Sequence, residues 1–380
     1  WNTSHTAYDG GKMDGFIYAQ KLLPSEAALA NYSMGYYTGA TLPDYWDYAS
    51  YYALDANFFG SQLTYTYPNR LYEVAARSNF PADPWTSSDP PLYNLTYATI
   101  INQLSQGKIS WGYYTGNWQD QWDCKPFSAK VLDGQHVYEG FNTFFGDLED
   151  FPAVQDTQPL CNHLRNTTDL MAEINSGSLP AVSWVNPNMT QSEHPGKAAT
   201  LQAGQLYVSS IINAIASNPS LWKHTAIFIT YDEFGGYYDQ VVPPQVDQWG
   251  YGFRLPLMVI SPYVHPGIYY GSPKGQPEDL SALLSTIESN WGLSPLTSRD
   301  ASDAPLWYMF NFHQKAIQPL IMPSNALGVY PWTTCVERGL CQIGTVLPPT
   351  HLASPPSYRY PGVLSGAAVY NLTVDEDPGD

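Results

Sequence analysis

Positive charge is scarce in this sequence. Its 380 residues include 16 lysines and arginines against 34 aspartates and glutamates, which gives a formal net charge of −18 at pH 7. Because a nucleic-acid-binding protein needs a cationic face to displace counterions from phosphates, this balance excludes a general nucleic-acid binder. Charged residues make up only 13% of the chain, whereas aromatic residues reach 15%. We therefore expect a surface that is polar mainly through Tyr, Ser, Thr, Asn and Gln side chains.

Long apolar segments are absent as well. No run of apolar residues approaches the roughly 18 residues that a membrane-spanning helix needs. The longest runs, such as residues 226–229 and 255–260, have the length of buried β-strands. Since 44% of the residues are hydrophobic, the chain can still bury a large core. We predict an ordered protein without a transmembrane segment.

Cysteine is rare, and none of the four cysteines lies in a CxxC pair, which argues against a zinc ribbon. They are Cys124, Cys161, Cys335 and Cys341. Two disulfides are the favoured use, with Cys335 and Cys341 as a short clip, although four cysteines permit three pairings. Six N-x-S/T sequons accompany them, at Asn2, Asn31, Asn94, Asn166, Asn188 and Asn371. Together these features predict a secreted or cell-surface protein that carries N-linked glycans.

The small number of cationic groups also bears on pH. When acid neutralises the carboxylates, the remaining repulsion depends on Lys, Arg and His, here 16 plus 8 residues. An extracellular acidic habitat fits this composition, and so does ordinary secretion of an acidic protein.

Helical and strand patterns alternate along most of the chain, which predicts an α/β fold. Apolar residues at i, i+3, i+4 and i+7 predict a helix over residues 208–215, which ends before Asn218-Pro219. The run TAIFIT (residues 225–230) is apolar on both faces, so we place it in the middle of a mostly parallel sheet. A second such strand, residues 255–261, precedes a helix over residues 280–291.

Weaker patterns predict further elements. We expect helices over residues 45–59, 95–104 and 168–174, and strands over residues 108–114 and 180–185. Beyond about Pro319 the sequence becomes proline-rich (LPPTHLASPPSYRYPG) and loses helical periodicity. We therefore divide the chain into a core, residues 1–320, and an extension, residues 321–380, that either packs on the core or forms a stalk.

Three clusters of polar residues could carry chemistry. The first, Tyr231-Asp232-Glu233-Phe234-Gly235-Gly236, follows the TAIFIT strand, and functional groups collect where parallel strands end. Two adjacent carboxylates before a glycine turn suit a metal site with oxygen ligands. A solvated acidic turn and a helix cap are the alternatives.

The second cluster is Ser192-Glu193-His194-Pro195, in a loop after a predicted strand. His194 could donate a proton to a leaving group, because the pKa of histidine lies near neutrality. Most single loop histidines have no such role.

The third cluster surrounds Thr66 and Arg70 in the segment TYTYPNR (residues 64–70). A threonine hydroxyl beside an arginine that can clamp a phosphate suits phosphoryl transfer. A turn built on Pro68-Asn69 explains the segment equally well, and Arg70 could simply brace that turn.

Five blocks of sequence stand together in a familiar order: GKMDGF (residues 11–16), TYPNRLY (66–72), SEHP (192–195), TYDEFGGYYD (230–239) and RLPLMVISPY (254–263). The combination resembles the phosphoesterase family of bacterial and plant non-specific phospholipases C and related acid phosphatases. The resemblance implies an alkaline-phosphatase-like three-layer α/β/α sandwich with a mostly parallel sheet, a bound divalent metal ion, and hydrolysis of phosphate esters.

The resemblance also implies roles for single residues. The acidic pair of the family that binds the metal matches Asp232 and Glu233, and its hydroxyl nucleophile matches Thr66. The histidine expected in the substrate pocket matches His194, and the one shortly before the GKMDGF block matches His5.

A mechanism follows from these roles. The metal would lower the pKa of the Thr66 hydroxyl and neutralise charge on the phosphate, and His194 or His5 would protonate the leaving alcohol. Water would then hydrolyse the phosphothreonine intermediate. The substrate would be a phospholipid head group or a small phosphate ester. The alternative is a structural glycoprotein of the cell envelope that keeps the fold without catalysis.

Two features depart from the family pattern. The Glu-Asn metal ligands of an ENxSFD-like motif, expected on a first strand, occur nowhere in residues 1–380. A fold without that central strand would leave an unpaired strand edge. Because the sequence starts at Trp1, we expect an N-terminal segment that precedes it or forms a separate cleaved chain. Phe234 and Gln240 stand where relatives commonly have histidines, which indicates either a more apolar pocket or a different substrate.

Overall fold

The computed structural model describes residues 1–23, 27–82, 95–116, 130–132, 135–137, 148, 151–155, 158–195 and 199–322. The strands fall into three sheets. The largest contains β1 (Ala53–Phe59), β7 (Ile227–Ile229), β8 (Arg254–Ile260), β9 (Gly267–Tyr269) and β10 (Glu278–Asp279). The second contains β2 (Trp111–Thr115), β5 (Leu164–Asn166) and β6 (Val182–Asn186). A separate hairpin pairs β3 (Lys130–Leu132) with β4 (Gln135–Val137).

Helices surround these strands. The first half of the chain contains α1 (Asn2–Tyr8), η1 (Asp9–Gly11), α2 (Phe16–Lys21), η2 (Ala27–Met34), α3 (Pro43–Tyr51), α4 (Thr66–Ala75), α5 (Ile100–Gln106), α6 (Pro152–Gln155), α7 (Gln158–Cys161) and α8 (Thr167–Ser176). The second half contains η5 (Met189–Gln191), α9 (Leu201–Ala216), α10 (Pro219–Trp222), α11 (Ser281–Trp291), α12 (Ser298–Ser302) and η6 (Leu306–Met309). None of these described helices combines the length and the apolar character needed to cross a lipid bilayer.

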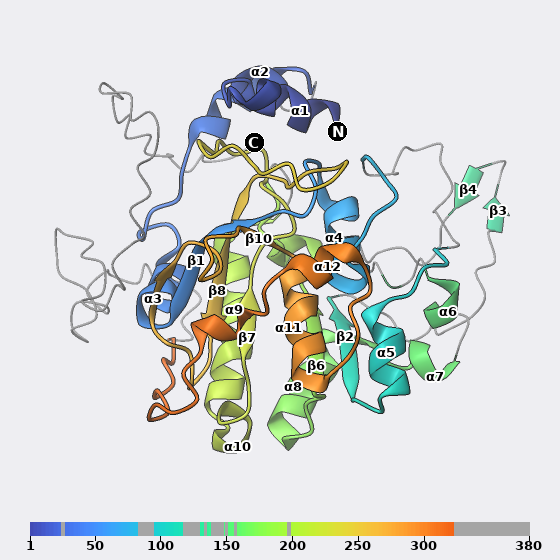
Figure 1. Ribbon diagram of the computed structural model, residues 1–380, viewed down its shortest axis with the longest axis vertical. Helices are drawn as coiled ribbons and strands as arrows, with labels where there is room; N and C mark the ends of the chain where they lie inside the picture. The colour runs from blue at the N-terminus through green and yellow to red at the C-terminus, as the bar shows by residue number, and fades with distance from the viewer. Residues whose placement is uncertain are drawn as a thin grey trace.

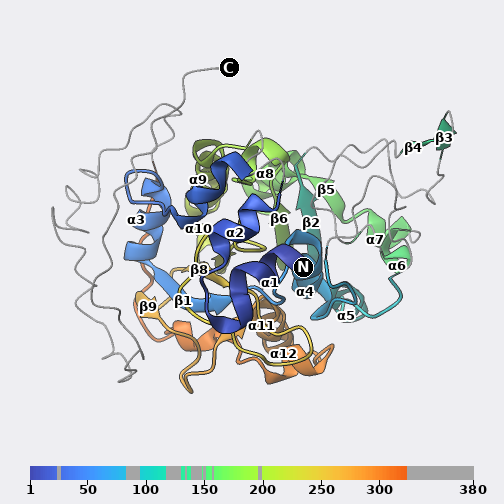
Figure 2. The same ribbon diagram turned by 90° about the horizontal axis from the view of Figure 1, so that it is seen from above.

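The helices lie on both sides of the strands, which confirms the predicted α/β class. Figure 2 shows α8 and α9 on one side of β8, β6 and β2, and α11 and α12 on the other. The helices α1 and α2 form a further group that crosses the top of the molecule in Figure 1. We call the segment from α1 to η2 the cap. Phe16 of the cap packs with Leu63 and Phe253 in one buried apolar cluster.

The sheets only partly match the predicted parallel arrangement. In the second sheet β2 lies between β5 and β6, and both pairs are parallel. In the largest sheet the order is β10-β1-β8-β7, and β8 runs antiparallel to both β1 and β7. The prediction of a mostly parallel sheet therefore holds for the second sheet, whereas the largest sheet is mixed, because β1 also pairs in parallel with β9 and β10.

The TAIFIT strand does not occupy the predicted position in the middle of a sheet. Within the described part of the chain β7 pairs with β8 alone, and β6 pairs with β2 alone. All three residues of β7 and four of the five residues of β6 are only half-buried, whereas β2 is buried throughout. Val185 of β6 and Ile227 of β7 nevertheless pack against the same apolar cluster. Among the described residues, β6 is thus an edge strand of the second sheet and β7 an edge strand of the largest sheet. Both border the same apolar cluster.

Several local predictions are confirmed. The predicted helices over residues 208–215, 280–291 and 168–174 are α9, α11 and α8. The helix predicted over residues 95–104 is confirmed only in its second half, because α5 begins at Ile100. The predicted strands over residues 108–114, 180–185 and 255–261 are β2, β6 and β8. In α9, the side chain of Thr200 accepts a hydrogen bond from the backbone N–H of Ala203, which caps the start of the helix.

The helix predicted over residues 45–59 is wrong in its second half. The helix α3 ends at Tyr51, because Tyr52 leaves helical geometry with φ −115° and ψ −131°. The next seven residues form β1, whose backbone pairs with β8, β9 and β10. Tertiary pairing and burial of Ala53, Phe58 and Phe59 outweigh the helical pattern here.

The predicted domain boundary falls next to residues that pack on the core. Leu320 and Met322 are buried, and the backbone N–H of Leu320 donates to the hydroxyl of Tyr52 at 2.8 Å. The rest of the extension lies outside the described residues. So do Cys124 and the predicted pair Cys335 and Cys341, and this pairing stays a prediction.

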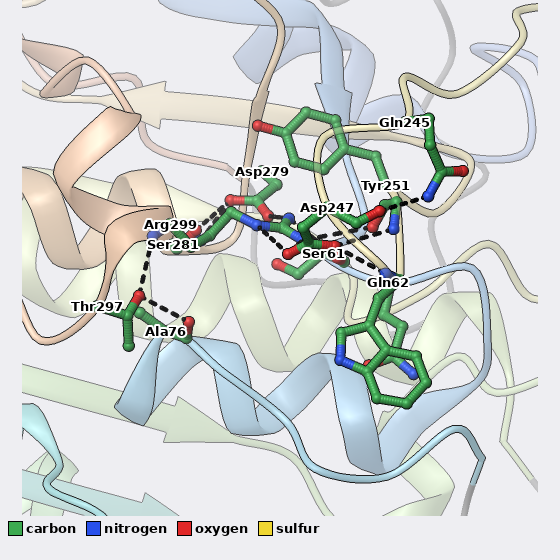
Figure 3. Close-up of polar contacts among 12 residues, drawn as sticks. Ser61, Gln62, Ala76, Gln245, Asp247, Tyr251, Asp279, Ser281, Thr297 and Arg299 are labelled. Carbon is green, nitrogen blue, oxygen red and sulfur yellow. Dashed lines mark hydrogen bonds and ion pairs between the residues drawn. The ribbon is translucent and has the colours of Figure 1, made fainter.

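A network of charged residues around the buried Arg299 holds α12 against the strands. Figure 3 shows the guanidinium of Arg299 between Asp279 and Asp247, with N···O distances of 2.5 and 2.6 Å. The same guanidinium lies over the rings of Tyr72 and Tyr251, 5.1 and 5.0 Å from their centroids. Every charge in this network has a partner of opposite sign, which offsets much of the cost of removing it from water.

Candidate functional site

Thr66 lies at the first position of α4, a helix of ten residues in which nine are buried. The predicted turn at Pro68-Asn69 is therefore wrong, because both residues belong to the start of this helix. Asn69 fixes the preceding loop: its Oδ1 accepts from the backbone N–H of Gln62 at 2.9 Å, and its Nδ2 donates to the carbonyl of Gln62 at 3.1 Å. Thr66 is thus placed by a rigid loop-to-helix junction.

The start of α4 has polar groups without partners. Tyr65, the residue before the helix, provides no side-chain cap, so its side chain does not close the N-terminus of α4. The Thr66 side chain is 8% exposed and makes no hydrogen bond within the described residues. Thr64 Oγ1 is buried and has no partner there either. A phosphate oxygen could satisfy such groups.

Arg70 is buried on the inner side of α4. Its Nη2 donates to Asn186 Oδ1 at 2.7 Å, at the end of β6, and to the hydroxyl of Tyr113 at 3.3 Å. These contacts tie α4 to the second sheet. They support the bracing role that the sequence left open for Arg70.

The acidic pair lies in the loop that follows β7. Asp232 is half-buried and makes no hydrogen bond or ion pair to any residue that the structure describes. Glu233 Oε2 accepts a hydrogen bond from the backbone N–H of Gly235 at 2.9 Å. Gly235 and Gly236 have φ values of 64° and 81°, so the turn requires glycine. The alternative of a helix cap is wrong, because this loop leads into the strand β8 and not into a helix.

Aromatic stacking joins the acidic loop to the start of α4. The ring of Phe234 stacks on that of Tyr65, the residue before Thr66, with centroids 6.1 Å apart and planes within 9°. Phe234 also contacts Phe253 and Phe16. A phenylalanine at this position therefore packs the loop between α4 and the cap, and Gln240 is exposed. The structure thus brings the first and third sequence clusters together.

Hydrogen bonds join the SEHP loop to the same place. Glu193 Oε2 accepts from the hydroxyl of Tyr231 at 2.5 Å, and Tyr231 immediately precedes Asp232. His194 is half-buried, and its Nδ1 lies 2.7 Å from the carbonyl of Pro195. If this nitrogen carries the proton and donates it to the carbonyl, Nε2 is left as an acceptor; in the doubly protonated imidazolium, Nε2 carries a transferable proton. The second cluster therefore joins the other two.

His5 lies in the cap, on α1. Its ring is 3.7 Å from that of Trp1, and its Nδ1 lies 3.0 Å from the Trp1 carbonyl. Burial lowers the pKa of His5 below its usual value. The link from His5 to the other clusters runs through the packing of α1 on α2, whose Phe16 contacts Phe234. Among the described residues, no hydrogen bond or ring contact joins His5 to Thr66 or Asp232.

The oxygen donors fit a divalent cation in kind. The described residues contain no group of three or more His, Cys, Asp or Glu side chains placed to hold a metal ion. Asp232, Glu233 and Thr66 could each contribute an oxygen, which is the ligand type that hard divalent cations prefer. The unpartnered carboxylate of Asp232 is consistent with such a ligand. Further ligands would have to join these three.

Sequence patterns missed the residues that connect the three clusters. They are Tyr45, Tyr65, Glu193 and Tyr231. The chain contains 30 tyrosines, so a tyrosine beside a motif carries little positional information. The one available signal was that Tyr65, Glu193 and Tyr231 each stand next to a candidate residue in the sequence.

Comparison with known proteins places the chain among phosphoesterases. The family model described as "Phosphoesterase family" matches residues 1–294. Phospholipase C B of Mycobacterium tuberculosis is 28% identical over 355 residues, which cover 82% of this chain and 63% of that protein. Non-specific phospholipase C1 of Arabidopsis thaliana is 25% identical over 352 residues, 84% of this chain and 60% of that protein.

A bacterial relative from another genus matches a smaller share of its own length. Non-hemolytic phospholipase C of Burkholderia pseudomallei is 26% identical over 340 residues, 77% of this chain and 44% of that protein. This chain thus spans between about two fifths and two thirds of the length of these curated relatives. Among solved structures, Ps i-CgsB is similar with a TM-score of 0.40 and 12% identity over 70% of each chain, a likeness too weak to carry an argument.

Proposed function

Because the chain belongs to the phosphoesterase family, we propose that it hydrolyses phosphate esters and that Thr66 is the nucleophile. The observation that carries this proposal is the position of the Thr66 hydroxyl. It stands without a partner among the described residues at the start of α4, and the stacked rings of Tyr65 and Phe234 connect it to the acidic loop. The helix N-terminus would receive the phosphate oxygens while the Thr66 oxygen attacks phosphorus.

The substrate class follows from the relatives that are named phospholipases C. We propose the head-group phosphate ester of a phospholipid as the substrate, with small phosphate esters as simpler substitutes. The leaving group from a phospholipid is a diacylglycerol alkoxide, which is a poor leaving group and needs a proton donor. His194 would supply that proton. His5 has a lowered pKa and would be protonated only in more acidic solution.

Asp232 and Glu233 would hold a divalent cation beside Thr66. When bound, the cation would lower the pKa of the hydroxyl and neutralise charge on the phosphate. Hydrolysis of phosphate monoesters is among the slowest uncatalysed reactions, which makes such assistance important.

We further propose that another β-strand, from a preceding segment or a separate chain, lies between β6 and β7. In the described part of the chain β6 and β7 each pair on one edge only, and both strands have half-buried apolar residues, which supports it. Amide hydrogen exchange tests it by comparing this chain produced alone with the protein isolated from its natural source. Protection of β6 and β7 only in the natural protein is expected, and equal protection in both would overturn the proposal.

The predicted secretion and glycosylation also remain proposals. The side chains of Asn2 and Asn31 are exposed, as attachment of a glycan requires. Mass spectrometry of the natural protein before and after enzymatic deglycosylation tests both sites.

The central experiment compares two substitutions of the nucleophile. Thr66→Val keeps the shape of the side chain without the hydroxyl, whereas Thr66→Ser keeps the hydroxyl. We expect Thr66→Val to lose hydrolysis of p-nitrophenyl phosphate and of phosphatidylcholine by at least about 1000-fold, and Thr66→Ser to retain part of it. Equal activity of Thr66→Val and the unmodified protein would remove Thr66 from the mechanism.

A further inference from the structure

Glu193 adopts a backbone conformation that is unusual for its residue type. Its φ is 60°, in the left-handed region that residues other than glycine rarely occupy. Such a conformation is unfavourable for a residue with a side chain and persists only where the surroundings impose it. The surroundings of Glu193 are therefore informative about what the residue does.

Two tyrosine hydroxyls hold the Glu193 carboxylate. The Tyr45 hydroxyl, from α3, donates to Oε1 at 2.7 Å, and the Tyr231 hydroxyl, from the end of β7, donates to Oε2 at 2.5 Å. Both carboxylate oxygens of Glu193 thus accept from fixed donors on two elements that are distant in sequence.

The fit around Glu193 also depends on a glycine. A Cβ atom at Gly204, in α9, would lie 2.2 Å from both Cγ and Oε1 of Glu193. A side chain at position 204 would therefore displace the carboxylate. Contacts with α3, with α9 and with the segment after β7 thus restrict the Glu193 side chain to one position.

Glu193 thereby connects two candidate catalytic groups. It precedes His194 in the sequence, and its partner Tyr231 precedes Asp232. We propose that Glu193 is a positioning residue that fixes the His194 loop relative to the acidic loop, so that His194 faces the leaving group. This inference rests on the proposed function, because it assigns His194 as the proton donor.

The same kind of contact elsewhere in the chain provides a control. Glu173, in α8, accepts from the hydroxyl of Tyr114 and pairs with Arg165, and neither partner adjoins a candidate catalytic residue. Loss of Glu173 should affect stability without a selective effect on one substrate.

The leaving group of the substrate distinguishes positioning from a purely structural role. p-Nitrophenolate leaves readily without a proton, whereas an alkyl alkoxide such as that from glycerol 2-phosphate requires one. We expect Glu193→Ala to reduce kcat by about 10- to 100-fold on glycerol 2-phosphate and by less than about threefold on p-nitrophenyl phosphate, with KM little changed. His194→Ala should show the same selectivity, and adding Glu193→Ala to it should cause little further loss.

The possible outcomes separate this inference from the proposed function. If the unmodified protein hydrolyses neither ester, the proposed function fails first and the inference with it. If it hydrolyses both, and Glu193→Ala loses activity equally on both as Glu173→Ala is expected to do, the positioning role is overturned. Should Glu193→Ala fail to fold, Tyr231→Phe removes one of the two hydrogen bonds and must show the same leaving-group selectivity.

Discussion

Two groups of carboxylates in this molecule differ in what surrounds them. Around Arg299, Asp279 is fully buried and pairs with the guanidinium, and Asp247 pairs with its other nitrogen. After β7, Asp232 is half-buried and has no polar partner within the described residues. A carboxylate that has lost water without gaining a partner is costly, whereas a paired one is much less so.

The carboxylates paired with Arg299 stabilise the fold, whereas the Asp232 carboxylate is placed to bind a ligand. The Arg299 network fastens α12 and the loop before β8 to the strand β10, and it needs nothing from outside the chain. The loop with Asp232 is instead fixed by its neighbours, through Tyr231, Phe234 and Gly235, and leaves its carboxylate open. Replacement of aspartate by asparagine should therefore reduce hydrolysis at position 232 and reduce the stability of the fold at position 279.

The largest expected effect is on catalysis. Asp232→Asn keeps the size of the side chain and removes its charge, so it should weaken cation binding and reduce hydrolysis by at least about 1000-fold, since metal assistance contributes several kcal/mol. The free energy of unfolding should change by less than about 1 kcal/mol, because no partner within the described residues is lost. Steady-state kinetics and urea denaturation on the same samples measure both. Unchanged hydrolysis by Asp232→Asn would mean that this carboxylate holds no cation needed for the reaction.

The matched substitution in the other region is Asp279→Asn. It leaves the buried Arg299 charge with Asp247 as its remaining ionic partner, and it should lower the free energy of unfolding by about 3–5 kcal/mol. The kcat of the folded protein at low temperature should be unchanged. A loss of kcat without a loss of stability would mean that the Arg299 network belongs to the active site.

Chelation should affect the two regions differently as well. Prolonged dialysis against EDTA should reduce hydrolysis by about 100-fold or more, and addition of a divalent cation should restore it. The fluorescence of Tyr72 and Tyr251, whose rings lie against Arg299, should stay unchanged. Hydrolysis that is insensitive to EDTA would argue against a metal enzyme.

The sequence predicted the elements whose conformation is set by neighbouring residues and missed those set by distant strands. The helix α9 was predicted because its apolar spacing and its stop at Asn218-Pro219 are local features. The strand β1 was missed because its conformation is imposed by pairing with β8, β9 and β10. Apolar residues on both faces of β7 indicated a covered strand, yet they could not reveal which neighbour covers it.

The candidate site shows the same division. Thr66, His194, Asp232 and Glu233 were named from short motifs and the resemblance to a family. Their arrangement depends on contacts between residues far apart in sequence, such as Tyr45 with Glu193, which are separated by 148 positions. No periodicity or spacing records such a contact, so the connecting residues emerged only from the structure.

The smallest expected effect concerns a third group of carboxylates, Glu278 and Asp55, which share the hydroxyl of Tyr308. Glu278 is buried, its Oε2 accepts from the Tyr308 hydroxyl at 2.7 Å, and Tyr308 also donates to Asp55 at 3.2 Å. Burial, opposed by that hydrogen bond, raises the pKa of Glu278 to about 8. Folded Glu278 therefore keeps a proton that the unfolded chain releases near pH 4.5.

A raised pKa of this kind stabilises the protein below the unfolded value, and the contribution is lost as pH rises through about 8. Stability should thus be higher at pH 5 than at pH 8, in agreement with an acidic habitat. Glu278→Gln imitates the protonated side chain, so it should flatten this slope by up to about 1.4 kcal/mol per pH unit. Urea denaturation at pH 5, 6, 7 and 8 measures the slope, with the unmodified protein as the reference. An equally steep slope in Glu278→Gln would show that this carboxylate is already ionised in the folded protein across this pH range.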